Sequence, residues 1–275
     1  MYFSMINSFN GNAAFFYFAH QDDECGVFQL IKDELRSGSH ISCFYFTSGT
    51  FSGELSTARN EESINILSKI GVSRDNIHFF GSEYKIPDCG LVDHIDFVCQ
   101  SIASNLKLAS SDCKIYIPAW EGGHPDHDAL HAAVVMAVKE NNLLSKTYQY
   151  ALYNGHKCFG PMFRVLSPLP ENGAAFKSPI SIINRMKFLG YCLRYPSQLK
   201  SWIGLFPFFF LHYIFRGHQT WQPVSVQRIF ELPHQGNLYF VNRGFANKRL
   251  FYSKINKFLN EKMTIKNSLD VMDLD

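Results

Sequence analysis

The sequence lacks the cysteine pattern of a disulfide framework. Its 275 residues include seven cysteines, which is an odd number, and no two of them form a Cys-x-x-Cys pair. Most of the cysteines lie inside apolar segments, as is typical of reduced, buried thiols in a cytosolic protein. The sequence therefore predicts a cytoplasmic location, and peripheral contact with a membrane stays open as an alternative.

The sequence also lacks an apolar run long enough to cross a bilayer. Its most apolar stretch, GLFPFFFLHYIF at 204–215, contains Pro207 and falls well short of the roughly 20 residues that a spanning helix needs. Packing in the core is favoured for this stretch over membrane contact or a role as a substrate gate. The N-terminal residues have no basic residue ahead of an apolar core, so no secretory signal is predicted. No transmembrane segment is therefore expected, whereas contact with a membrane surface is left open.

Internal repeats and low-complexity tracts are absent, and apolar residues are abundant instead. Hydrophobic residues make up 46% of the chain and aromatic residues 15%, enough to bury a large core without disulfides or an oligomer. We expect a single domain over 1–275, in which 1–158 form a regular core. Residues 159–275, where prolines interrupt the pattern, are expected to form a less regular C-terminal lobe packed on it. A homo-oligomer is compatible with the sequence.

The net charge of +2 conceals an uneven distribution. Residues 1–150 carry 10 basic and 18 acidic side chains, a net charge of −8, whereas 151–275 carry 16 and 6, a net charge of +10. A basic half with interleaved aromatic residues is typical of contact with an anionic glycan, phosphate groups or a membrane surface. A solvated basic face is an equally favoured interpretation. Nucleic acid is not expected as a partner, because the motifs described below indicate different chemistry.

Strand-like and helix-like patterns alternate through the first part of the chain. Strands are expected at 13–19, 40–47, 76–80, 113–118 and 148–153, and helices at 24–36, 57–70, 91–108 and 127–142. Such alternation with short connections predicts an α/β fold with a Rossmann-like, mostly parallel sheet and helices on both faces. A helix at 180–193 is the clearest element of the C-terminal lobe.

Polar side chains follow two of the predicted strands at their carboxyl ends, where open α/β sheets bind ligands. The segments are AAFFYFAHQDDE at 13–24 and IYIPAWEGGHPDHDALH at 115–131. His20 and Asp23 can face one point from a turn, and His127 supplies a third group. Two imidazoles and a carboxylate with an open fourth position fit one catalytic zinc ion, with another divalent metal as the alternative.

Three further residues of these segments are candidates for the chemistry. Asp22 is not needed as a ligand, and a carboxylate beside a metal-activated water is well placed as a general base. His124, as an imidazolium, could stabilise an oxyanion or protonate a leaving amine, and Asp126 would then orient it and favour its charged form. Alternatively, Asp22 or Asp23 caps the following helix. His131 is a further candidate ligand, although packing in the helix is favoured for it.

The two segments resemble those of a known family. AHQDDE and GGHPDH are similar to AHPDDE and HPDH, the signature motifs of the PIG-L/LmbE family of zinc-dependent N-acetylglucosaminyl deacetylases. TSGTFSGELSTARNEES, IPDCGL and KFLGYCLRYPSQ resemble the family's Gly-rich loop with its Arg-x-x-Glu helix, its PDG segment and its Lys-rich helix, so the resemblance covers about 13–200. The departure is Gln21, which stands where the family usually has a proline that would stiffen the turn.

The resemblance implies an LmbE-like fold and one zinc ion bound by His20, Asp23 and His127. It also implies that Asp22 is the general base and that His124 stabilises the transition state. It also places Arg59, Glu54 and Asp88 where the family contacts its sugar substrate. Arg59 could instead form an ion pair with Glu62 on the same helix, and Asp88 could be an ordinary turn residue.

These residues predict a zinc hydrolase that removes the N-acetyl group from an N-acetylglucosamine-type sugar conjugate, giving acetate and a free amino sugar. Because the C-terminal half is basic, the conjugate is expected to be anionic, such as a phosphate-linked or lipid-linked sugar. Two alternatives remain open. One is a zinc amidohydrolase acting on another acylated amine or glycoside; the other is a sugar- or polyanion-binding relative with weak catalysis, suggested by Gln21.

Overall fold

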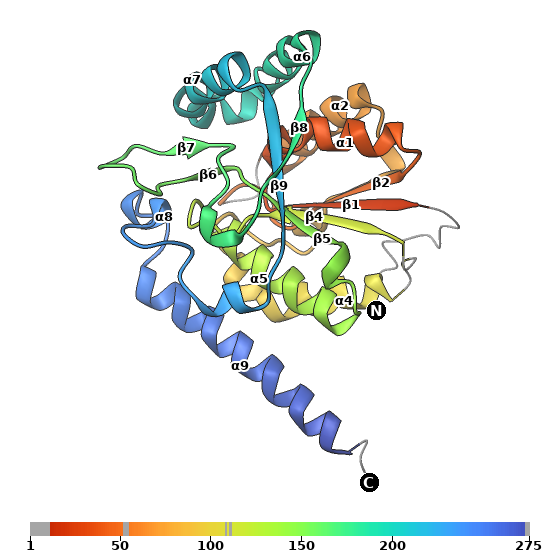
Figure 1. The fold of residues 1–275 in the computed structure, drawn as a ribbon, viewed down its shortest axis with the longest axis vertical. Coiled ribbons are helices and arrows are strands. Elements are labelled where there is room, and N and C mark those ends of the chain that lie inside the picture. The colour runs from red at the N-terminus through yellow and green to blue at the C-terminus, as the bar shows by residue number, and fades with distance from the viewer. Residues whose placement is uncertain (1–11, 52–54, 108, 110–111, 273–275) are drawn as a thin grey trace.

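The computed structural model describes residues 12–51, 55–107, 109 and 112–272, which form a seven-stranded sheet between two layers of helices (Figure 1). The strand order in the sheet is β3-β2-β1-β4-β5-β9-β8. The strands are β1 (Ala13–Phe18), β2 (His40–Tyr45), β3 (Ile77–His78), β4 (Lys114–Pro118), β5 (Thr147–Tyr150), β6 (Tyr153–Asn154), β7 (Arg164–Val165), β8 (Phe176–Pro179) and β9 (His218–Pro223). The helices are α1 (Phe28–Arg36), α2 (Ser56–Ile70), α3 (Phe80–Glu83), α4 (Ile95–Leu106), α5 (Pro125–Glu140), α6 (Ile182–Cys192), α7 (Leu199–Phe215), α8 (Tyr239–Asn242) and α9 (Lys248–Met272).

β1 lies at the centre of the sheet because its side chains are apolar on both faces. Phe15 and Tyr17 pack in the core on one side, and Phe16 and Phe18 pack in the core on the other, as the alternation of side chains along a strand requires. β1 pairs in parallel with β2 and with β4. The carboxyl ends of β1 and β4 therefore lie side by side, at the same end of the strands.

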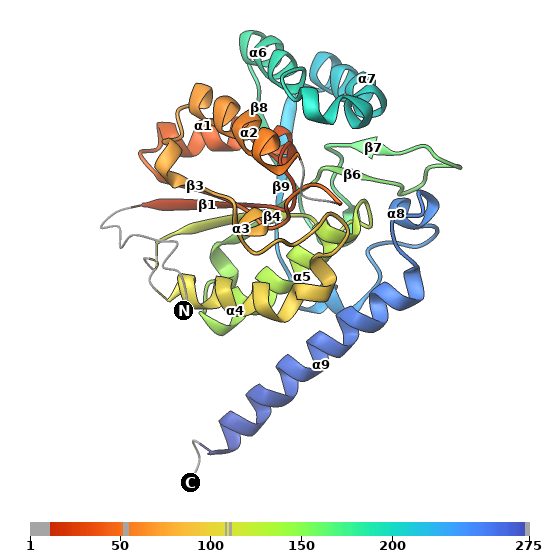
Figure 2. The same cartoon turned by 180° about the vertical axis from the view of Figure 1, so that it is seen from behind.

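Helices cover both faces of the sheet (Figures 1 and 2). α1, α2, α6 and α7 lie on one face, and α4, α5 and α9 lie on the other. β1 to β5 run parallel, whereas β9 pairs antiparallel with β5 and β8. The prediction of a mostly parallel α/β sheet with helices on both faces is confirmed.

Four elements differ from the ranges expected from the sequence. The helix expected at 91–108 is divided into a 3-10 turn at Leu91–His94 and α4. The helix expected from residue 24 is preceded by a separate 3-10 turn at Asp23–Gly26, because Asp22 has a left-handed backbone conformation that an α-helix cannot include. The strand expected at 76–80 is only the short β3, since the chain turns at once into α3. The strand expected at 148–153 ends with β5 and resumes as β6, which pairs with β7 outside the main sheet.

The part of the chain after residue 158 contributes to the sheet as well as packing against it, because β8 and β9 form one edge. All seven cysteines are free, and five of them are buried: Cys25, Cys43, Cys99, Cys113 and Cys192. Across the described ranges, no helix combines the length and the apolar character needed to cross a membrane.

Candidate metal centre

The three ligands expected from the sequence meet at the carboxyl ends of β1 and β4. His20 Nδ1 lies 3.3 Å from His127 Nε2, which lies 3.1 Å from Asp23 Oδ1. His20 Nδ1 lies 3.6 Å from Asp23 Oδ2. Ligand atoms of a tetrahedral zinc ion are separated by roughly 3.3 Å, given zinc–ligand distances of about 2.0 to 2.1 Å. The three side chains therefore have the spacing of a metal-ligand set. His131 points elsewhere, with its Nδ1 2.8 Å from the Pro118 carbonyl.

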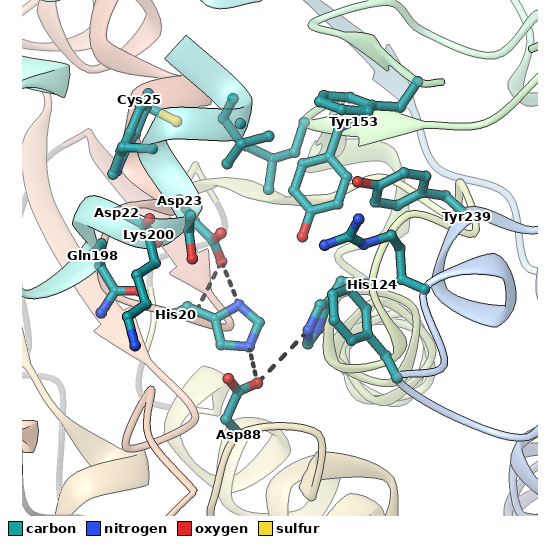
Figure 3. A pocket seen from close by; sticks show the side chains of 18 of the residues that line it. His20, Asp22, Asp23, Cys25, Asp88, His124, Tyr153, Gln198, Lys200 and Tyr239 are labelled. Atoms are coloured by element: carbon teal, nitrogen blue, oxygen red, sulfur yellow. Dashed lines mark hydrogen bonds and ion pairs between the residues drawn. The ribbon is translucent and has the colours of Figure 1, made fainter. Parts of the chain in front are cut away.

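Hydrogen bonds fix the orientation of two of these ligands. Asp23 Oδ2 accepts the backbone N–H groups of Ala19 at 3.0 Å and His20 at 2.8 Å. His20 Nε2 lies 3.1 Å from Asp126 Oδ2 and 3.2 Å from Asp88 Oδ1. Because two carboxylates face Nε2, the proton of the neutral ring belongs there, and Nδ1 is left free to bind a metal. Figure 3 shows Asp23 and Asp88 on opposite sides of the His20 ring.

The charges of these groups depend on one another. Burial acts to raise the pKa of Asp23, but the neighbouring His127 and His20 hold it well below its usual range. Burial acts to lower the pKa of His20, but the carboxylates of Asp126, Asp23 and Asp88 hold it well above its usual range. The cluster thus favours an ionised Asp23, the form that binds a cation.

Two other groups of side chains bring possible ligand atoms within 4.8 Å of one another: His20, His124 and His127, and His20, Asp88, His124 and Asp126. Neither group includes Asp23. Its oxygens nevertheless lie 3.1 Å from His127 Nε2 and 3.6 Å from His20 Nδ1, which is well within 4.8 Å. Asp126 already accepts the backbone N–H groups of Cys89 at 2.7 Å and Leu91 at 3.0 Å. His124 Nδ1 accepts the backbone N–H of Asp126 at 3.3 Å. These prior bonds favour the set that contains Asp23.

Asp126 orients His20 and not His124, which corrects the pairing expected from the sequence. Its Oδ2 is 3.1 Å from His20 Nε2 but 3.9 Å from His124 Nδ1. The reason is the start of α5, where His124 caps the helix through Nδ1 and the Asp126 carboxylate turns away from it.

The neutral form of His124 is favoured, which also differs from the expected imidazolium. Burial and the nearby His20 hold the pKa of His124 well below its usual range. Because Nδ1 accepts a backbone hydrogen bond, the ring proton is on Nε2, which lies 3.6 Å from Asp88 Oδ1. His124 can therefore donate a hydrogen bond from Nε2 without carrying a charge.

Asp22 adopts a backbone conformation that is rare for a residue with a side chain, with φ of 113°. Its N–H donates to Glu24 Oε2 at 2.9 Å, and Glu24 Oε1 accepts the Tyr195 hydroxyl at 2.9 Å. Burial raises the pKa of Asp22 to about 7, against the opposing charge of Arg59. The supporting role of Glu24 was missed at the sequence level, although its place in the acidic run was a signal.

Arg59 joins two loops beside the cavity. Its guanidinium donates to the carbonyl of Gln21 at 2.8 Å and to the carbonyl of Gly49. Glu62, the alternative partner, instead accepts hydrogen bonds from the turn that precedes α7. Gln21 is itself buried and donates from Nε2 to Asn60 Oδ1 at 2.7 Å. A proline at this position could not form that bond.

A cavity of about 360 Å³ opens beside these groups. The residues expected from the sequence that line it are His20, Asp22, Asp23, Arg59, Asp88 and His124. Asp126 and His127 are buried behind its wall, and Glu54 lies outside the described residues. Tyr153 and Tyr239 also line the cavity, and their hydroxyls point into it (Figure 3). Both tyrosines were missed, because Tyr153 follows a strand end without a motif and Tyr239 is distant in sequence.

The wall that carries Tyr153 is held by the loop between β4 and α5. Glu121 Oε1 accepts the N–H groups of Leu152 at 2.7 Å and Tyr153 at 3.0 Å. Burial raises the pKa of Glu121 to about 8. A Cβ at Gly123 would lie 1.9 Å from the Tyr153 carbonyl oxygen, so this close approach of two backbones requires glycine.

Comparison with known proteins agrees with this geometry. The PIG-L family model, described as GlcNAc-PI de-N-acetylase, matches residues 15–138, a span that includes both strand ends and all three expected ligands. The match covers less than half of the chain and makes residues 15–138 similar to the PIG-L family. The resemblance seen in the two sequence motifs is thereby confirmed. No curated protein sequence matches the chain.

Several solved structures with a similar fold are named as deacetylases. A deacetylase of the teicoplanin biosynthesis pathway has a TM-score of 0.60 and 16% identity, covering 78% of this chain and 98% of its own. The zinc-inhibited form of teicoplanin deacetylase Orf2 has a TM-score of 0.59 and 15% identity, with the same coverage of 78% and 98%. N,N'-diacetylchitobiose deacetylase from Pyrococcus horikoshii has a TM-score of 0.53 and 15% identity, covering 80% of this chain and 86% of its own. At these identities the likeness establishes the LmbE-like fold.

Proposed function

We propose that this protein hydrolyses the amide of an N-acetylated amino-sugar conjugate, releasing acetate and a free amine. The observation that carries the proposal is the meeting of His20, Asp23 and His127, at 3.1 to 3.6 Å between ligand atoms, beside a cavity lined by Asp22 and His124. The family description, GlcNAc-PI de-N-acetylase, supports the same reaction, and the named activities of the three similar structures are consistent with it.

The ligand set fits zinc. Two imidazole nitrogens and one carboxylate are the ligands of catalytic zinc sites, and imidazole favours zinc over magnesium. His20, Asp23 and His127 would hold the ion, and the cavity beside them would admit water and substrate. A bound zinc ion acidifies water and polarises an amide carbonyl. The zinc-inhibited form of teicoplanin deacetylase Orf2 makes it advisable to test zinc at several ratios to protein, alongside other divalent metals.

The side chains of the cavity have complementary roles in the proposed reaction. Asp22 takes a proton from the attacking water as its oxygen bonds to the amide carbon. His124 Nε2–H donates a hydrogen bond to the oxygen of the tetrahedral intermediate. Asp22 then returns its proton to the nitrogen as the carbon–nitrogen bond breaks, so that the amine leaves neutral and the carbonyl carbon leaves as acetic acid, which loses its proton to solvent to give acetate.

Polar groups around the cavity are suited to a sugar conjugate. Asp88, Arg59 and the hydroxyls of Tyr153 and Tyr239 would bind sugar hydroxyl groups. Lys200 and Arg243 also line the cavity, and their charges favour a conjugate with a phosphate or another anionic group.

The test is mass spectrometry of N-acetylated amino-sugar conjugates incubated with the zinc-loaded protein. The panel should include phosphorylated and uncharged conjugates, N-acyl sugars with longer acyl chains, and acylated amines without a sugar. We expect loss of one acetyl group from an N-acetyl sugar conjugate, with release of acetate. Absence of acetate release from every sugar conjugate, with cleavage of another amide instead, would contradict the substrate class.

Asp22→Asn tests the assigned base. Its activity should fall about 10²- to 10⁴-fold, while its zinc content stays that of the parent because Asp22 is not a ligand. Asp75→Asn, on the exposed surface, is the matched control and should retain full activity. Parental activity in Asp22→Asn would show that another group takes the proton.

A further inference from the structure

α7 is apolar on its outer side as well as on its inner side. Trp202, Phe209 and Tyr213 are buried against the rest of the molecule. The opposite side leaves large apolar side chains exposed at helical spacing: Leu199, Ile203, Phe210, Leu211, Ile214 and Phe215. Ile203 is 70% exposed and Phe215 79%. A helix that faced only water would present polar residues on that side.

α6 extends this exposed apolar surface. It lies beside α7 at the same end of the molecule (Figures 1 and 2). Its exposed apolar side chains, together with the residue that follows the helix, are Ile182, Ile183, Met186 and Leu193. We call the exposed apolar residues of α6 and α7, with Leu193, the apolar face. Single exposed apolar residues are normal, but a cluster of this size marks a contact surface.

The apolar face lies in a segment that carries basic charge only. No aspartate or glutamate occurs anywhere in 172–230. The helices and the turn between them carry four basic residues, Arg185, Lys187, Arg194 and Lys200, and a fifth, Arg216, directly follows α7. Within the described part of the chain, none of these five forms an ion pair. Arg185 donates hydrogen bonds to the carbonyls of Ile180 and Ile214, and the positive charge of the other four is available to an external partner.

We propose that the apolar face docks on the surface of a bilayer that contains anionic lipids. Exposed apolar side chains inserted at the level of the headgroups, with basic residues beside them, are the properties of a helix that lies in the membrane interface. α7 lies in that plane instead of crossing the bilayer, because it has 17 residues and Pro207 in its interior.

Charge selects a lipid surface over a second copy of the chain. Two copies joined through the apolar face would bring like charges together without acidic partners, which opposes association. Anionic headgroups supply the missing negative charge. Each basic residue near an anionic membrane surface is worth about 1 kcal/mol, or about fivefold in binding.

Docking in this way would bring the cavity close to the lipid headgroups. Lys200, Gly204 and Phe209 of α7 also line the cavity. The inference goes beyond the proposed reaction, since it concerns where the protein is held and not which bond it breaks.

Vesicle flotation tests the inference on the full chain. The parent should bind vesicles of phosphatidylcholine with phosphatidylserine, bind vesicles of phosphatidylcholine alone far more weakly, and lose affinity as the salt concentration rises. Ile203→Ser with Phe210→Ser should lower the partition coefficient at least about tenfold. Lys187→Glu with Arg194→Glu should lower it by about tenfold or more. None of these four residues lines the cavity.

Two matched variants on α9, at the other end of the molecule (Figure 1), act as controls. Leu250→Ser removes an exposed apolar side chain, and Arg249→Glu with Lys257→Glu reverses two exposed charges. Both should bind anionic vesicles like the parent. All variants should cleave a water-soluble substrate at the parental rate, so that a lost membrane contact is distinguished from a lost reaction.

Three outcomes would overturn the inference. The parent could fail to bind anionic vesicles, or the variants of the apolar face could bind them as well as the parent does. The parent could also prove dimeric by light scattering, with Ile203→Ser and Phe210→Ser together giving a monomer, in which case the apolar face pairs two copies of the chain.

Discussion

The metal centre buries polar side chains, whereas the apolar face exposes apolar ones. Both depart from the usual distribution, in which polar side chains are exposed and apolar ones are buried. At the metal centre, His20, Asp23 and His127 are buried. On the apolar face, residues such as Ile203 and Phe215 are exposed. Buried polar groups are costly unless partners converge on them, and here the partners come from several loops. Exposed apolar groups lack a partner within the chain. The first arrangement therefore indicates chemistry, and the second indicates contact with another surface.

Loss of a ligand is expected to break the metal centre most completely. His127→Ala removes one of three ligands, so zinc content should fall from about one ion per chain to near zero, and deacetylation should fall more than about a thousandfold. Metal analysis and acetate release measure the two effects. His94→Ala, on the exposed surface, should change neither. Full zinc content in His127→Ala would place the metal on another set of residues.

Two adjacent phenylalanines test the comparison within one helix. Phe209 is 1% exposed and Phe210 is 42% exposed. Phe209→Ala should lower the free energy of unfolding by about 3 to 5 kcal/mol through a buried cavity, whereas Phe210→Ala should lower it by less than about 1 kcal/mol. Urea denaturation measures both. Equal losses would mean that the outer side of α7 is covered in solution by the chain itself.

The buried Glu121 should make stability depend on pH. Burial raises the pKa of Glu121 from 4.5 to about 8 in the folded protein. Its contribution is therefore complete below about pH 4.5 and is lost as the pH rises through about 8, with a slope of up to about −1.4 kcal/mol per pH unit. Glu121→Gln keeps an acceptor for Leu152 and Tyr153 but cannot ionise. The unfolding free energy of the Glu121→Gln variant should fall less steeply between pH 5 and 8 than that of the parent. The same slope in both proteins would contradict the raised pKa of Glu121.

The smallest expected effect comes from restoring the proline of the family motif. Gln21→Pro removes the hydrogen bond to Asn60, so the free energy of unfolding should fall by about 1 kcal/mol. Zinc content should stay unchanged, because the ligands themselves are not altered. Thermal unfolding with metal analysis checks both, and Asn60→Ala should give a similar loss. A more stable Gln21→Pro would show that stiffness of the turn outweighs the lost bond.

Much of the fold and of the metal centre follows from short stretches of sequence. Residues 13–18 are apolar throughout, and this local pattern predicts a central strand whatever surrounds it. His20 and Asp23 follow that strand directly, so their meeting with His127 needed only the parallel pairing of β1 and β4. The lengths of β3 and β5 were less predictable, since they depend on the point at which the neighbouring chain turns away.

The partners of the buried polar residues could not be predicted in the same way. Asp126 was expected to orient His124 and instead faces His20, because the start of α5 and the loop that holds Cys89 and Leu91 compete for its atoms. Tyr239 reaches the cavity from more than 200 residues beyond β1. Only the folded chain brings such groups together.

The sequence by itself determined the ligand types, their order and the sheet that presents them, since strand pattern and motif are local properties. Tertiary structure alone decided which carboxylate faces which imidazole, which aromatic residues wall the cavity and which side of α7 remains exposed. The last of these is the clearest case. The stretch 204–215 is almost uniformly apolar in sequence, and packing against one side only is what divides it into a buried and an exposed face.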